Sequence, residues 1–335
     1  MRALVTGGAG YVGSHTAKAL AKAGIEMVTL DDLSRGHRWA VRWGPLIEGD
    51  FGDAALLERT IRSYRIEAVL HFAAFAYVGE SMESPGRYFS NNVAKTLPLL
   101  ETMRLTGVRH IVYSPSCATY GVPVKVPICE QDRQAPVNPY GESKRMVERM
   151  LDWYGQCHGL HWVALRYFNA AGADPEGELG EDHYPETHLI PRAIAAAFGA
   201  IPHLDVFGND YETTDGTAVR DYVHVSDLAQ AHLRALHYLM DGHPSGAFNL
   251  GTGQGHSVFD VVEAVERATG QPVPLHVRPR RPGDPPTLLA DGSKAASTFG
   301  WKPRHSDIES ICGTASRWYE RTAGRRERLA GDWTK

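Results

Sequence analysis

The stretch RALVTGGAGYVG, residues 2–13, decides the fold, because a short apolar run leads directly into a cluster of glycines. An amphipathic segment, Tyr11–Ala23, follows and stops at Gly24, which is typical of a helix end. Glycine permits a tight turn and lets the backbone approach a pyrophosphate, whose negative charge then faces the helix N-terminus. We therefore expect a strand, a turn and a helix that bind a dinucleotide. The residues expected at this turn are Gly7, Gly10, Tyr11, Val12 and Gly13.

A carboxylate at the end of the next apolar run strengthens this interpretation. Asp31 follows Gly10 by 21 residues, where its side chain can accept hydrogen bonds from an adenosine ribose. Asp31 and Asp32 would repel a 2′-phosphate, so NAD is favoured over NADP as the cofactor. Arg35 and Arg38 follow closely, and their positive charges work against that preference.

The order of expected elements indicates an α/β fold, because short β-rich runs alternate with helical patterns. The expected strands are Arg2–Thr6, Glu26–Asp31, Ala68–Phe72, Arg109–Ser114 and His161–Tyr167, and the expected helices are Tyr11–Ala23, Ala54–Tyr64, Arg87–Thr106 and Pro139–His158. Beyond Asn169 the loops lengthen, and helices are expected at Pro191–Gly199, Val225–Met240 and Val258–Thr269.

This order predicts a Rossmann-type doubly wound parallel sheet with a smaller C-terminal substrate-binding region. Residues 1–168 would form the NAD-binding domain. Residues 169–335 would form the substrate domain and return one strand, near Phe248–Gly251, to the main sheet. Ligands are expected in the cleft between the two.

Composition excludes several other classes of protein. The net charge is -4 and no long basic tract occurs, so a nucleic-acid-binding surface is not expected. No apolar run approaches the ~20 residues that span a bilayer, and the N-terminus lacks the pattern of a secretory signal. The 4 cysteines form no CxxC pair, which favours reduced thiols in a cytoplasmic protein without membrane contact.

The reacting groups are expected at the start of the helix Pro139–His158. Tyr140 and Lys144 are four residues apart and share one helix face. A free phenol has a pKa near ~10, and a nearby ammonium together with the positive nicotinamide ring would favour the phenolate. Ser116 follows an apolar strand, at the sheet edge where ligands bind in such folds. It could share a proton with Tyr140, or it could simply cap a turn.

Seven motifs occur in order between residues 7 and 285, namely GGAGYVGS, HFAA, YxxxK, RYFNAAGA, HLIP, GTAVRDYVHVSDL and RRPGDP. Over nearly the whole chain this combination resembles the UDP-glucose 4-epimerases of the extended short-chain dehydrogenase/reductase family. The resemblance implies inversion at C4 of a UDP-sugar, with Tyr140 taking the proton of O4 while C4 gives hydride to NAD. The 4-keto sugar would then turn within the site, and the hydride would return to its opposite face.

The same resemblance assigns residues to each task. Tyr140, Lys144 and Ser116 would be catalytic. The NAD site would comprise Gly7, Gly10, Tyr11, Val12, Gly13, Asp31, Asp32, Asp50, Phe51, Phe72, Ala73, Ala74, Asn92, Ser114, Tyr140, Lys144 and Phe168. The substrate site would comprise Ser116, Tyr140, Asn169, His188, Leu189, Phe207, Arg220, Arg281, Asp284 and Leu288. For Asp50 and Phe51, a turn aspartate before a core phenylalanine is an equal alternative to contact with adenine.

Three positions depart from the pattern of the family. Ala76 replaces a lysine of some members, and His188 replaces a common asparagine. Leu288 replaces a bulky tyrosine that closes the sugar pocket in members restricted to hexoses without N-acetyl groups, so N-acetylated sugars would have room. Residues 76–81, AYVGES, also resemble pentose-directed 4-epimerases. UDP-N-acetylhexosamines and the pair UDP-xylose and UDP-arabinose therefore stay open as substrates.

The residues near the expected site also bear on other activities that occur on the same fold. A dehydratase needs an additional acid and base, yet Cys117 and Ala118 stand where such enzymes carry acidic residues. A decarboxylase of a uronic acid stays open, whereas a non-catalytic NAD-binding protein would commonly lack the Tyr140 and Lys144 pair. The helices Arg87–Thr106 and Pro139–His158 correspond to those that pair in relatives, so a homodimer is expected.

No metal site is expected from the sequence. Glu181, His183 and His188 are possible ligands, but their spacing matches no standard metal motif and Pro185 lies between them. These residues are interpreted as part of a loop, apart from the nucleotide contact assigned to His188.

Overall fold

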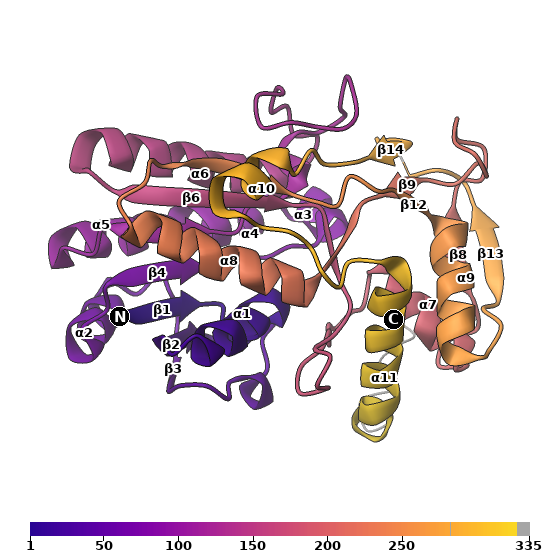
Figure 1. The fold of residues 1–335 in the computed structure, drawn as a ribbon, viewed down its shortest axis with the longest axis horizontal. Helices are drawn as coiled ribbons and strands as arrows, with labels where there is room; N and C mark the ends of the chain where they lie inside the picture. Colours follow the sequence, from indigo (N-terminus) through magenta and orange to yellow (C-terminus); the bar gives the residue numbers. More distant parts are fainter. Residues whose placement is uncertain (282, 327–335) are drawn as a thin grey trace.

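The computed structural model describes residues 1–281 and 283–326 and contains a seven-stranded sheet, all of whose strand pairs are parallel (Figure 1). The strand order is β11-β6-β5-β4-β1-β2-β3. Its strands are β1 (Arg2–Thr6), β2 (Glu26–Asp31), β3 (Leu46–Glu48), β4 (Ala68–His71), β5 (His110–Tyr113), β6 (His161–Tyr167) and β11 (Gly246–Leu250). The chain changes direction across the sheet between β1 and β4, which is where open α/β folds bind ligands.

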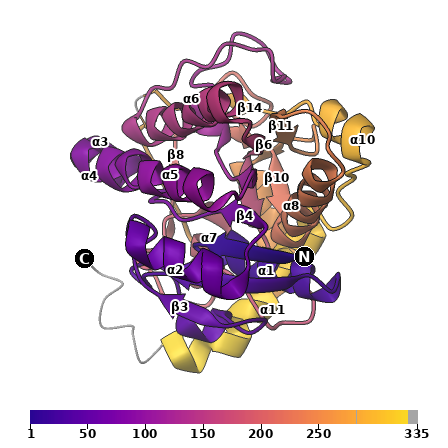
Figure 2. The same ribbon diagram turned by 90° about the vertical axis from the view of Figure 1, so that its left-hand side faces the viewer.

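Two helical layers cover this sheet (Figure 2). The main helices are α1 (Tyr11–Lys22), α2 (Ala54–Tyr64), α5 (Thr96–Thr106), α6 (Pro139–His158) and α8 (Val225–Met240). Helices α1 and α8 share one buried core with Ala3 and Val5 of β1, whereas α2, α5 and α6 share the other with Leu4. Successive side chains of a strand point to opposite faces, so the continuous apolar run of β1 fills both cores.

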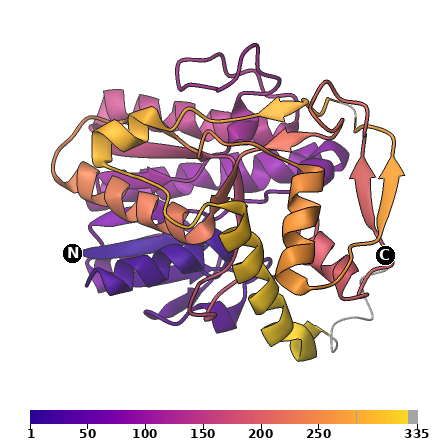
Figure 3. The ribbon, with the colours of Figure 1, turned by 45° about the vertical axis from the view of Figure 1, so that its right-hand side comes forward.

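The smaller region is built mainly from residues after 168 (Figure 3). It contains β7 (Asn169–Ala171), β8 (Leu204–Phe207), β9 (Val219–Arg220), β10 (Tyr222–His224), β12 (His256–Ser257), β13 (Leu275–Arg278), β14 (Thr287–Leu288), α7 (Leu189–Ala197), α9 (Val258–Thr269) and α11 (Ile308–Arg326). Helices α7, α9 and α11 share a third core. The short elements of the chain are η1 (Arg38–Ala40), α3 (Val78–Glu83), α4 (Pro85–Tyr88), η2 (Phe89–Ala94), η3 (Cys117–Thr119) and α10 (Ser293–Phe299).

The predicted doubly wound fold is confirmed, and so is the returning strand, because β11 pairs with β6. The division into domains at residue 168 stays a prediction. The last residues of the predicted substrate domain, 327–335, lie outside the described part of the chain. Within that part, no helix is long and apolar enough to cross a membrane.

The expectation of one continuous helix over Arg87–Thr106 was wrong. The π-helical segment η2 interrupts it, and the N–H of Lys95 bonds to the carbonyl of Ser90. Pro98 has no N–H with which to continue the ordinary α-helical bonding at this point. The interruption also turns Asn92 inward, where its amide bonds to both backbone groups of Phe75. Such π-helical turns are frequent at functional sites.

Helix α7 begins two residues earlier than the expected Pro191 and ends at Ala197 rather than Gly199. Proline is tolerated in a first helical turn, because the first N–H groups have no partner inside the helix. Pro191 therefore marks the first turn and not the first residue.

A buried histidine ties α8 to the end of β5. His232 Nδ1 lies 2.8 Å from the carbonyl of Leu228, and Nε2 lies 2.6 Å from Ser114 Oγ. A carbonyl only accepts, so Nδ1 carries the proton and the neutral ring accepts from the serine hydroxyl at Nε2. Burial lowers the pKa of His232 to about 4.

Acidification is expected to destabilise the protein through this ring. Unfolded histidine has a pKa near ~6.5, so between that value and pH 4 the unfolded chain binds the extra proton. In His232→Gln, the loss of unfolding free energy between pH 7.5 and pH 5.5 should be smaller by about 1.4 kcal/mol. Urea unfolding at one fixed NAD concentration measures it. The control His158→Gln removes an exposed ring. An equal loss in wild type and His232→Gln would contradict the argument.

Candidate active site

The glycine turn forms where β1 and β4 end. Gly7 has φ +73°, and a Cβ there would lie 2.5 Å from the N atom of Ala73. A Cβ on Gly13 would lie 2.3 Å from the carbonyl oxygen of Gly7. Gly10 is the N-cap of α1 and offers no side-chain acceptor to the first turn of the helix. The turn therefore has the form that a pyrophosphate requires, with bare backbone and a helix N-terminus.

Asp31 fixes this turn as well as marking the predicted ribose position. Its carboxylate accepts the N–H groups of Ala9 and Leu33, both at 2.9 Å. Burial raises the pKa of Asp31, and these two hydrogen bonds oppose the rise. Asp32 instead accepts the N–H and hydroxyl of Ser34. The carboxylate oxygens of Asp31 retain lone pairs for a further donor.

Asp50 and Phe51 match the alternative of a turn aspartate before a core phenylalanine. Phe51 is buried in the core, with its ring 5.2 Å from that of His71. Asp50 accepts the N–H of Gly52 at 2.8 Å and pairs with Lys95 Nζ at 2.7 Å. A contact of Asp50 with adenine stays a prediction.

The segment after β4 lies against the glycine turn. The N–H groups of Phe72 and Ala73 both donate to the carbonyl of Thr6, at 2.9 and 3.1 Å. Ala74 follows directly, so all three residues predicted here are brought to the NAD-binding edge.

Asn92 is buried behind this segment and does not line its exposed surface. Its side chain is buried and bonds to Phe75, and its Nδ2 also lies 3.0 Å from Ser143 Oγ. Asn92 thus positions the segment that follows β4. Phe168, also predicted at the NAD site, is buried against Tyr120 and Ala290.

Tyr140 reaches Ser116 because α6 begins very close to η3. Asn138 caps α6 by accepting the N–H of Gly141 at 2.8 Å. A Cβ on Gly141 would lie 2.4 Å from the carbonyl oxygen of Ala118. Ser116 Oγ caps η3 by accepting the N–H of Ala118. The same hydroxyl lies close enough to Tyr140 to lower the pKa of the phenol. The turn cap is therefore observed, and the sharing of a proton with Tyr140 stays a prediction.

Lys144 is buried one helical turn further on. Its Nζ donates to the carbonyl of Ser114 at 2.9 Å and lies 5.9 Å from the centre of the Tyr140 ring. Burial lowers the pKa of Lys144 to about 7. Burial also raises the pKa of Tyr140, and the Ser116 hydroxyl opposes the rise only in part. The groups of the chain alone therefore do not produce the expected phenolate.

The predicted nucleotide-binding residues gather in the smaller region. Arg220 Nη2 lies 2.5 Å from Asp284 Oδ1, and the Arg220 side chain is 14% exposed, so it is not a solvated surface charge. The guanidinium of Arg281 lies 3.9 Å from the centre of the Phe207 ring, and burial lowers its pKa. Leu288 of β14 is paired in register with Arg220. A rigid cationic fork suits a pyrophosphate.

Asn169 joins this group through a residue that sequence reasoning missed. Its amide donates to the carbonyl of Asp221 at 2.9 Å. The Asp221 carboxylate is fully buried and accepts from the backbone of Thr252, Gly253 and Ala290. The only signal in the sequence was an acidic residue inside the motif GTAVRDYVHVSDL.

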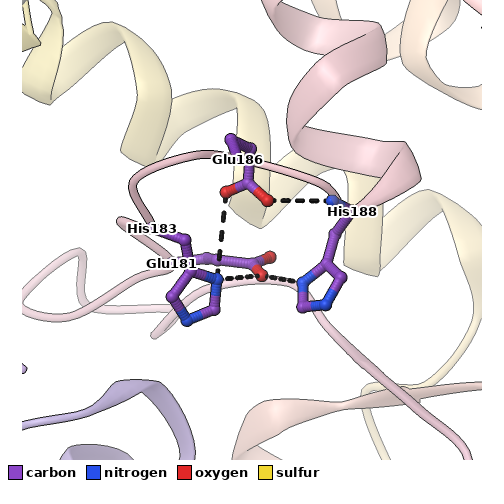
Figure 4. A group of neighbouring side chains, drawn as sticks. All are labelled: Glu181, His183, Glu186 and His188. Atoms are coloured by element: carbon purple, nitrogen blue, oxygen red, sulfur yellow. Dashed lines mark hydrogen bonds and ion pairs between the residues drawn. The ribbon is translucent and has the colours of Figure 1, made fainter. Parts of the chain in front are cut away.

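His188 and Leu189 lie at the N-terminus of α7, where His188 is the N-cap. The Nδ1 atom of His188 bonds to the Glu181 carboxylate. Desolvation lowers the pKa of His188, but the charges of Glu181 and Glu186 outweigh it and raise the pKa to about 9. The structure also brings His183 and Glu186 to this place (Figure 4). Of these two, only Glu186 was not named among the possible ligands in the sequence.

These features define a class of protein. A parallel sheet with a glycine turn at its switch point, and a buried tyrosine, lysine and serine at the same edge, are those of a short-chain dehydrogenase/reductase. The chain matches the model of the NAD dependent epimerase/dehydratase family over residues 3–251, and it belongs to that family. Its cofactor is NAD.

Similar proteins cover almost the whole chain. A UDP-glucose 4-epimerase from Lacticaseibacillus casei is 49% identical over 96% of this chain and 97% of its own length. The crystal structure of a UDP-glucose 4-epimerase from Brucella ovis in complex with NAD is 52% identical, with a TM-score of 0.93 over 94% of this chain and 97% of that one. A UDP-Glc/GlcNAc 4-epimerase from Campylobacter jejuni is 39% identical, with a TM-score of 0.84 over 96% and 99%.

Proposed function

We propose that this protein is an NAD-dependent UDP-glucose 4-epimerase that interconverts UDP-glucose and UDP-galactose through a 4-keto intermediate. The observation that carries the proposal is the buried contact of Tyr140 with Ser116, at the edge of the sheet that also holds the glycine turn. Relatives with this name are similar over nearly the whole chain, which supports the same activity.

The chain fits NAD, because Gly7 and Gly13 leave no room for a Cβ and the N-terminus of α1 faces the turn. When bound, NAD would supply the acceptor for the hydride of C4 and a positive ring charge. Tyr140 Oη, held by Ser116, removes the proton of the sugar O4 and later returns it. Lys144 is fixed by its bond to the carbonyl of Ser114.

Ionisation of Tyr140 is the step that needs an outside charge. Burial raises its pKa, so the phenolate forms when positive charge is close by. The nicotinamide ring and a protonated Lys144 would supply that charge together. The phenol would therefore act as a base only when the cofactor is bound.

The nucleotide is held separately from the reacting sugar. Arg220, Arg281 and Asp284 lie in the smaller region, whereas Tyr140 lies at the start of α6 and Ser116 in the loop after β5. Such a division would anchor the UDP while the 4-keto ring turns over, so that hydride returns to the other face.

Replacing the base tests this mechanism. Tyr140→Phe should lower the conversion of UDP-galactose to UDP-glucose by about 10²–10⁴-fold, which is the usual contribution of a general base. The bound NAD should be unchanged. The matched control is Tyr154→Phe, since Tyr154 lies on the same helix but bonds to Glu101. A wild-type rate in Tyr140→Phe would refute the assignment.

A second substrate class is supported by Leu288. It packs against the cluster of Tyr120, Ile128, Phe168 and Ala290, and it is smaller than the tyrosine expected in hexose-restricted members. The relative from Campylobacter jejuni is named for both glucose and N-acetylglucosamine. We therefore propose UDP-N-acetylhexosamines as additional substrates, with UDP-xylose and UDP-arabinose as the remaining alternative.

Leu288 provides a direct test of sugar selectivity. Leu288→Tyr should reduce turnover of UDP-N-acetylglucosamine by about 10- to 100-fold and leave turnover of UDP-galactose unchanged. The reason is that adding a larger side chain to a packed site costs about 1–3 kcal/mol. Leu288→Met, which conserves volume, should keep both activities. Lack of any wild-type turnover of UDP-N-acetylglucosamine would reject the proposal. Analysis of products by NMR also distinguishes epimerisation from decarboxylation.

We also propose a cytoplasmic homodimer. Exposed apolar side chains gather on α5 and α6, including Leu97, Leu105, Met146 and Trp153. A dimer formed through these two helices would remove these apolar groups from water.

Trp153→Glu should then yield a monomer by light scattering, whereas Val124→Glu, in an exposed loop, should not. The 4 cysteines are free, as suits a reducing compartment.

A further inference from the structure

Four side chains from the segment before α7 converge on one point (Figure 4). They are Glu181, His183, Glu186 and His188, and one ligand atom of each lies within 4.8 Å of the others. Glu181 Oε1 lies 3.0 Å from His183 Nδ1 and also contacts His188 Nδ1. Glu186 Oε2 lies 4.0 Å from His183 Nδ1. The spacing along the chain is short, so a single segment supplies all four groups.

The charges at this point require compensation. The side chains of Glu181 and Glu186 are only 7% and 2% exposed. Two carboxylates this close and this buried repel each other and have lost most of their hydration. Without a metal, the His188 imidazolium described above offsets only one of these two negative charges. One divalent cation, bound by neutral imidazoles in place of that proton, would balance both carboxylates.

The ring of His183 gives independent support. Its Nδ1 atom is buried and makes no hydrogen bond among the described residues. It lies 3.0 Å from Glu181 Oε1, but the alignment is not that of a hydrogen bond. A buried ring nitrogen without a hydrogen bond is unusual in proteins. A lone pair on that nitrogen can serve a metal ion instead.

The donor set selects the kind of ion. Two imidazole nitrogens and two carboxylates suit zinc and similar transition metals, whereas magnesium and calcium prefer oxygen ligands alone. Tetrahedral zinc with bonds of about 2.0–2.2 Å places its ligands about 3.4 Å apart. The separations of 3.0 and 4.0 Å lie on either side of this value, whereas the contact of Glu181 with His188 is shorter and would lengthen when a metal ion binds between them.

We propose that Glu181, His183, Glu186 and His188 bind one divalent transition-metal ion of the zinc type. Both histidines would bind through Nδ1, which leaves Nε2 of each ring free. The side chain of His188 is 47% exposed, so its outer edge stays available to the nucleotide assigned to it above. The ion would fix the start of α7 and the orientation of this ring. This last consequence rests on the proposed function, whereas metal binding itself does not.

Metal titration of the tag-free protein tests the proposal. The protein, saturated with NAD, is treated with a chelator, dialysed and titrated with Zn²⁺ by calorimetry, and its metal content is measured by mass spectrometry. We expect one equivalent bound and a higher unfolding temperature with Zn²⁺. His183→Gln and His188→Asn should each lower the affinity at least about 100-fold and abolish the thermal shift. Co²⁺ in place of Zn²⁺ should give visible absorption bands of a tetrahedral site.

The control variant is His276→Gln. His276, His203 and Asp205 form a second, more exposed group of possible ligands, so this variant should retain the tight equivalent. Asparagine is common at position 188 in the resembling family, so His188→Asn is decisive even if His183→Gln does not fold. Three results would each overturn the proposal. The first is unchanged Zn²⁺ affinity in a folded His188→Asn variant, and the second is a loss of Zn²⁺ affinity in His276→Gln as large as that in His188→Asn. The third is the absence of one tightly bound Zn²⁺ in the wild-type protein. Epimerase activity is measured separately, and its absence would refute only the proposed function.

Discussion

The carboxyl ends of β1 and β4 approach each other so closely that no side chain fits between them. Thr6 receives two N–H groups from the chain after β4, and Gly7 faces the N atom of Ala73 directly. This contact sets the position of the glycine turn, of α1 and of the segment that Asn92 holds from below. A side chain at Gly7 would push the ends of β1 and β4 apart and displace the glycine turn from the segment after β4. The arrangement therefore depends on backbone contact more than on any particular side chain.

A second close approach governs the reacting groups. Gly141 allows α6 to touch the carbonyl of Ala118, and Tyr140 is thereby held beside Ser116. The two glycine contacts lie at the same edge of one sheet, so the positions of the Tyr140 phenol and of the glycine turn are fixed relative to each other. Electrostatic stabilisation is effective only when such groups are held in place beforehand. The high pKa of the buried phenol then makes the chemistry dependent on the complete complex.

Local sequence was sufficient for the main sheet. The apolar run at Arg2–Thr6, the glycines after it and the helical periodicity of Pro139–His158 predicted elements with the observed bounds. The interruption near Asn92 was missed because the missing N–H of Pro98 does not by itself show where the helix changes. The contacts of Asn92 with Phe75 and Ser143, which are distant in sequence, appear only in the folded chain. Glu181, His183 and His188 were named as possible ligands, but their convergence with Glu186 was not predicted, for a related reason. Their spacing follows no helix or strand period, and only the folded path of the loop brings the atoms together.

The bond between His232 and Ser114 has a consequence for the order in which the protein matures on the ribosome. The carbonyl of Ser114 holds Lys144, yet His232 and the returning strand β11 are synthesised much later. A nascent chain that has reached only the end of β6 presents that strand as an unpaired edge and leaves one face of α1 uncovered. Domains generally fold as units during synthesis, so here the unit closes only after residue 250 has emerged.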